Sequence, residues 1–186
     1  YKEALKVLKL DSMCNVPSFL EVLAKAEETL GEHSDPSSLY MLAWLYSLYQ
    51  ELGFREEEWF DRMKVAVLDL LEDNKRYKIV ISSHKSAAGL LFSLYHLASK
   101  RENIREYSLR VLNDIKDLNW HEFDGEIMAY SYMLAKAVRT SEILEELGRN
   151  IDNKVREWLG SPAKTPQKIR DIIYIFFTYL YILDEK

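Results

Sequence analysis

The sequence predicts an all-α fold in a single domain that spans residues 1–186. Apolar residues recur at helical spacing, hydrophobic residues make up 48% of the chain, and only six Gly and four Pro interrupt it. A chain of this length can bury one sizeable core, and scarce Gly and Pro favour long helices over tight turns. The chain begins with Tyr1 rather than Met, which is consistent with a domain excised from a longer chain.

Four segments have the apolar stripe of an amphipathic helix. Each places apolar residues three and four positions apart and charged residues between them. These segments run over residues 19–30, 59–71, 104–118 and 144–159. A shorter helix is expected before them, at about residues 2–10.

Four other segments, 39–49, 87–98, 127–138 and 172–183, are apolar on nearly every side. A helix of this kind must be buried, and these runs are too short to span a bilayer. They alternate with the amphipathic segments, and short connections make neighbouring helices antiparallel. We therefore expect about eight or nine helices in an array of antiparallel hairpins. The array is either a two-layer, solenoid-like α/α arrangement or a compact bundle, with outer amphipathic helices covering inner apolar ones.

Two short stretches interrupt this pattern. The β-branched residues of 77–83 predict an irregular crossing. The basic residues Lys75, Arg76 and Lys78, just before it, are interpreted as part of a solvated linker.

Composition indicates which partners the protein is expected to bind and in which cellular compartment it is expected to lie. A net charge of −5 argues against a general nucleic-acid surface, and no membrane segment is expected. The single cysteine, Cys14, cannot form an internal disulfide, so a cytoplasmic location is expected. Few Gln among many Lys and Glu is typical of thermophilic proteins, although seven Asn point the other way.

No motif predicts a catalytic centre, a metal site or a cofactor. A Gly-rich phosphate loop, a Cys pair and an HExxH sequence are all missing from the 186 residues. His121 with Asp124 or Glu126 has the chemistry of a metal site or an acid–base pair, but acidic residues also favour a helix N-terminus. Ser83, His84 and Lys85 have groups that hold phosphate or carboxylate, or that simply cap a helix. His96, within an apolar segment, is interpreted as a hydrogen-bonded core residue.

Tyrosines carry the main binding hypothesis, because nine of the 12 lie in the apolar segments. A buried tyrosine needs a partner for its hydroxyl, and tyrosine is favoured at interfaces, so a groove lined by these side chains is expected. Core packing with hydroxyls at the layer edges is the alternative. The predicted binding residues are Tyr40, Tyr46, Tyr49, Tyr95, Tyr130, Tyr132, Ser83, His84 and Lys85.

Together these features predict a non-catalytic helical scaffold that binds a protein or peptide partner. Self-association through the C-terminal helix is a further option, because no later segment covers it. The alternative is an enzyme or small-ligand-binding protein, with its site at the helix ends near His84 and His121. A third interpretation, the ligand-binding half of a transcription regulator, would need a DNA-binding module that the sequence does not show.

Overall fold

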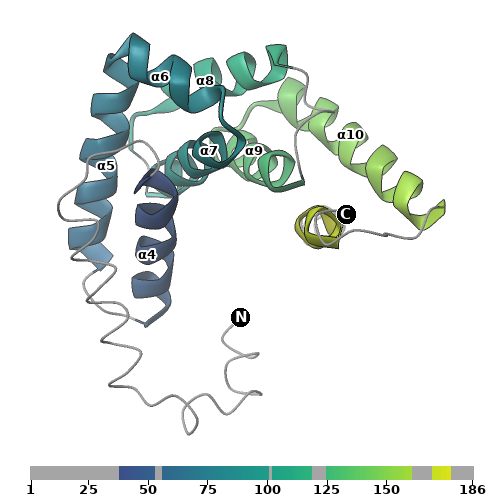
Figure 1. Ribbon diagram of the computed structural model, residues 1–186, viewed down its shortest axis with the longest axis horizontal. Helices are drawn as coiled ribbons and strands as arrows, with labels where there is room; N and C mark the ends of the chain where they lie inside the picture. The colour runs from purple at the N-terminus through teal and green to yellow at the C-terminus, as the bar shows by residue number, and fades with distance from the viewer. Residues whose placement is uncertain (1–37, 53–55, 101, 119–124, 161–168, 177–186) are drawn as a thin grey trace, which may run out of the picture.

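The computed structural model describes residues 38–52, 56–100, 102–118, 125–160 and 169–176 (Figure 1). Within these ranges the chain forms helices and turns and no strand. The helices are α4 (Ser38–Leu52), α5 (Glu56–Glu72), α6 (Asn74–Ile81), α7 (His84–Ser99), α8 (Arg105–Asp117), α9 (Gly125–Ala137) and α10 (Ser141–Gly160). Residues 169–176 are also helical and are called the C-terminal helix below. The all-α prediction is confirmed.

The apolar helix α7 lies at the centre of the domain, between α4 and α9 (Figure 1). Ten of the 16 residues of α7 and ten of the 13 residues of α9 are buried, as their apolar sequences predict. The C-terminal helix continues this succession on the far side of α9, where Tyr174 packs edge-on against Tyr130 with ring centroids 6.0 Å apart. The predicted apolar segments therefore pack against one another in chain order.

The amphipathic helices cover these inner helices with one buried stripe each. α5 buries Trp59, Met63 and Val67 against α4 and α7. α8 packs on α9 and α7, and α10 packs on α9. This agrees with the expected division into inner and outer helices. The hairpin array, as a solenoid-like arrangement or as a compact bundle, stays a prediction.

Residues 74–81 overturn the prediction of an irregular crossing and a solvated linker, because they form the helix α6. The Asp73 side chain caps this helix by accepting hydrogen bonds from the backbone N–H groups of Lys75 and Arg76. Tyr77 and Val80, three residues apart, face the core, whereas Ile79 is 67% exposed. The cap and the buried pair outweigh the weak helix propensity of β-branched residues.

Gly89 lets the backbones of α7 and α4 approach closely. A Cβ atom built at Gly89 would lie 2.7 Å from the backbone nitrogen of Tyr40. Gly125 at the start of α9 serves the same purpose, because its added Cβ would collide with the backbone carbonyl oxygen of Asp171 in the C-terminal helix. Both glycines thus allow the N-terminal halves of inner helices to pack closely.

Several predictions lie outside the described residues: the helices at 2–10 and 19–30, Cys14, His121 and the second half of the last apolar segment. Among the helices that are described, none combines the length and the apolar character needed to cross a membrane.

Candidate functional site

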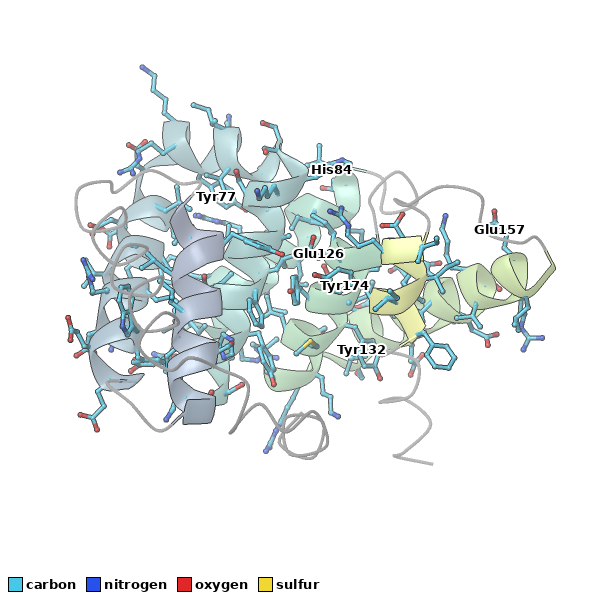
Figure 2. All side chains as sticks on the ribbon, turned by 60° about the horizontal axis from the view of Figure 1, so that its bottom comes forward. Tyr77, His84, Glu126, Tyr132, Glu157 and Tyr174 are labelled. Atoms are coloured by element: carbon cyan, nitrogen blue, oxygen red, sulfur yellow. The ribbon has the colours of Figure 1, made fainter. Side chains whose placement is uncertain are left out.

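A buried carboxylate, Glu126, lies where the N-terminal parts of the inner helices meet. It is 5% exposed and sits in the first turn of α9. The Tyr40 hydroxyl, from α4, donates a hydrogen bond to Glu126 Oε1 at 2.5 Å. The Tyr174 hydroxyl, from the C-terminal helix, also has Glu126, Tyr40 and Tyr130 as hydrogen-bonding neighbours. Figure 2 shows Glu126 and Tyr174 facing each other across the two helices.

We call Tyr40, Glu126, Tyr130 and Tyr174 the tyrosine–glutamate cluster. Burial raises the pKa of the Tyr130 hydroxyl far above its usual value, and the nearby Tyr174, Tyr40 and Glu126 raise it further. Burial likewise raises the pKa of Tyr174. Tyr130 and Tyr174 therefore stay protonated. Hydrogen bonding of Tyr40 and Tyr174 to Glu126 joins three helices that are far apart in the sequence.

The predicted polar site at the start of α7 is at the surface. Ser83, His84 and Lys85 are all exposed, and Ser83 occupies the N-cap position without a side-chain cap hydrogen bond. The Lys85 ammonium lies 6.0 Å from the centre of the Tyr40 ring, beside the tyrosine–glutamate cluster. The structure thus brings Lys85 near Tyr40, whereas the partner expected for His84, His121, lies outside the described residues.

A second buried group surrounds His96 near the end of α7. Its Nε2 lies 2.7 Å from Ser47 Oγ of α4, and its ring contacts those of Tyr46, Phe92 and Tyr95. Burial lowers the pKa of His96 to about 4, so the imidazole is neutral at physiological pH. This agrees with the interpretation of His96 as a hydrogen-bonded core residue.

The predicted binding tyrosines separate into two groups. Tyr46, Tyr130 and Tyr132 are buried in the core, where their rings pack against neighbouring side chains. Their burial gives them a packing role, which favours the alternative of core packing, and their part in binding stays a prediction. Tyr40 and Tyr95 are half-buried and keep an accessible part. The side chain of Tyr49 lies outside the described residues.

Sequence reasoning missed a third polar group on α6 and α8. The Tyr77 hydroxyl donates a hydrogen bond to Asp114 Oδ2 at 2.5 Å, and the Arg110 guanidinium lies 4.4 Å from the centre of the Tyr77 ring. Burial, followed by the bond to Asp114, raises the pKa of Tyr77 well above its usual range. The residues are 37 positions apart in the sequence, so no local pattern joins them.

The C-terminal helix presents an apolar face to solvent. Ile169, Ile173 and Phe176 are each about half exposed, at 50%, 50% and 51%. Their spacing of four and three residues places them on one side, which we call the C-terminal apolar face. The opposite side, with the buried Ile175, faces the core. The structure therefore leaves part of this helix uncovered among the residues that it describes.

Within the described ranges, no group of three or more His, Cys, Asp and Glu side chains is arranged to hold a metal ion. Three comparisons with known proteins also found nothing, since no protein family, no curated protein and no solved structure matches this chain. The case for a function therefore depends on the chain's own surfaces and buried groups.

Proposed function

We propose that the domain is a non-catalytic helical scaffold that binds a protein partner through the C-terminal apolar face. The observation that carries this proposal is the exposure of Ile169, Ile173 and Phe176 along one side of a helix. Apolar side chains scattered singly over a surface are ordinary, but a contiguous row along one helix is typical of an interaction site. Ile79 and Leu159, by contrast, are exposed on separate helices.

The geometry of this face favours an amphipathic helix as its occupant. Apolar residues at positions i, i+4 and i+7 are the anchors by which one helix packs against another. Three half-exposed side chains offer on the order of 300 Å² of apolar surface. A stable dimer of two copies buries roughly 1,200–2,000 Å², so this face suits a short helical segment of another protein better than a second copy of the chain.

The tyrosine–glutamate cluster holds the helix that carries this face against α9 and α4. Tyr174 lies on the inner side of the same helix and has Glu126 of α9 and Tyr40 of α4 as hydrogen-bonding neighbours. A surface held in place before binding loses less conformational entropy on association than a mobile one does. The polar groups thus support a binding function by fixing the helix that carries the apolar residues.

Affinity capture from an extract of the source organism tests this proposal with two matched variants. Ile173→Asp places a charge at the centre of the C-terminal apolar face, and Ile79→Asp places the same charge on an exposed isoleucine of α6. We expect one stoichiometric partner with the wild-type chain and with Ile79→Asp, and its loss with Ile173→Asp.

The same preparations are analysed by native mass spectrometry. Identical capture by all three chains would overturn the proposal. A homodimer that only Ile173→Asp dissociates would overturn the choice of occupant and assign the face to a second copy.

A further inference from the structure

A second surface feature is a cleft of about 420 Å³ where α7 and α9 end and α8 begins. Its floor is apolar, with Ile104 and Val138 buried. Its charged residues are Glu102, Arg105 and Arg139, of which both arginines are exposed. We call it the two-arginine cleft. Since its lining includes no residue of the C-terminal helix, it is separate from the C-terminal apolar face.

The charge of this cleft is positive because its one carboxylate is already paired. Glu102 Oε1 accepts a hydrogen bond from Lys64 Nζ at 2.8 Å. Arg105 Nε donates to the backbone oxygen of Val138 at 3.4 Å, which holds the guanidinium beside the floor. Among the described residues, neither Arg105 nor Arg139 forms a salt bridge. Two guanidinium groups thus remain available in a chain whose net charge is −5.

Arg139 also occupies a backbone position that favours glycine. Its φ angle is 57°, in the left-handed region. The N–H of Thr140 donates to the carbonyl of Ala135 and the N–H of Arg139 to that of Lys136, both at 3.1 Å. This is the Schellman ending of a helix, in which glycine is the usual residue at the position of Arg139. An arginine there is strained, and strain of this kind is concentrated at functional sites.

We propose that the two-arginine cleft binds a carboxylate of an acidic, partly apolar peptide segment. Guanidinium groups bind carboxylates through paired hydrogen bonds, and the floor at Ile104 and Val138 accommodates an aliphatic side chain next to the carboxylate. The N-cap residue of α8, Ile104, has no side-chain oxygen to accept from the first-turn N–H groups, so the helix end adds to the attraction for an anion. This inference goes beyond the proposed function, because it concerns a second site that is separate from the C-terminal apolar face.

Fluorescence anisotropy with a labelled peptide of alternating Leu and Glu, blocked at both ends, tests the proposal on the purified chain. The same peptide with Gln in place of Glu is the control ligand. We expect Arg139→Gly to weaken binding of the acidic peptide about tenfold. The same variant should raise the Tm by about 2–4 °C, because glycine relieves the left-handed backbone. Arg149→Gln, an exposed arginine of α10 away from the cleft, should change neither quantity.

Equal binding of the Glu and Gln peptides, or unchanged binding by Arg139→Gly, would overturn the proposal. Displacement of the peptide by inorganic phosphate at an equal concentration would also overturn it, since it would assign the cleft to phosphate. Ile173→Asp should leave the peptide affinity unchanged. The cleft can therefore fail to bind the peptide while the C-terminal apolar face still binds its partner, and the face can fail to bind a partner while the cleft still binds the peptide.

Discussion

At the scale of single residues, the buried polar side chains lead to the clearest predictions. For His96, we predict how the free energy of unfolding depends on pH. Its pKa is about 4 in the folded protein, against 6.5 for a histidine exposed to water, so the unfolded chain binds the extra proton between these values. The resulting stability is complete above pH 6.5 and is lost as the pH falls towards 4, by about 3 kcal/mol. Urea unfolding at pH 7 and pH 4 measures this loss.

His96→Gln is the matched variant for that measurement, because glutamine can keep a hydrogen bond to Ser47 but does not titrate. The carboxylates of the chain contribute to acid sensitivity in both proteins, so the difference between them isolates the imidazole. An equal loss of stability in wild type and His96→Gln would contradict the assignment of a buried, neutral His96.

Glu126 leads to a second prediction at this scale. Tyr40→Phe removes a hydroxyl that donates to a buried carboxylate, so it should lower the free energy of unfolding by about 1–3 kcal/mol. Tyr95→Phe is the control, because Tyr95 is half-buried and its hydroxyl makes no hydrogen bond among the described residues. Equal effects of the two substitutions in urea unfolding would show that the tyrosine–glutamate cluster does not stabilise the fold.

At the scale of the helices, two glycines test the close packing of α4 and α7. Gly89→Ala would place a Cβ atom 2.7 Å from the Tyr40 backbone, so we expect it to destabilise the domain by about 1–3 kcal/mol. Gly148→Ala in α10 meets no atom within 4 Å and should stabilise the protein by about 0.5–1 kcal/mol, because alanine favours a helix. Thermal unfolding compares the two, and effects of the same sign would contradict the described helix contact.

The helices also show where sequence periodicity is sufficient and where it is not. The apolar segments at 87–98 and 127–138 correspond to α7 and α9, because a helix that is apolar on every side must be buried in the core. The prediction of an irregular crossing over residues 77–83 is wrong, because the Asp73 cap and the burial of Tyr77 and Val80 outweigh the β propensity of this stretch. For a short helix such as α6, the cap and the buried side chains determine the structure more than the helix propensity of its residues does.

At the scale of the whole molecule, the surfaces were less predictable than the core. The tyrosine groove rests on residue type alone and stays a prediction, since residue type does not reveal that Tyr46 and Tyr130 are buried. The sequence marks Glu126 only as a neighbour of His121, because its contacts with Tyr40 and Tyr174 join segments that are distant in the sequence. The lack of a later segment to cover the last apolar run is the more useful signal, since its first half contains Ile173 and Phe176 of the C-terminal apolar face.

Site-specific photo-cross-linking tests the central claim, that this face binds another protein, most directly. The photoreactive residue p-benzoylphenylalanine is incorporated at position 173 in one chain and at position 79 in another, and both are irradiated in the source extract. We predict one protein adduct of defined mass from position 173 and no such adduct from position 79. The same set of adducts from both positions, or none from position 173, would contradict the claim.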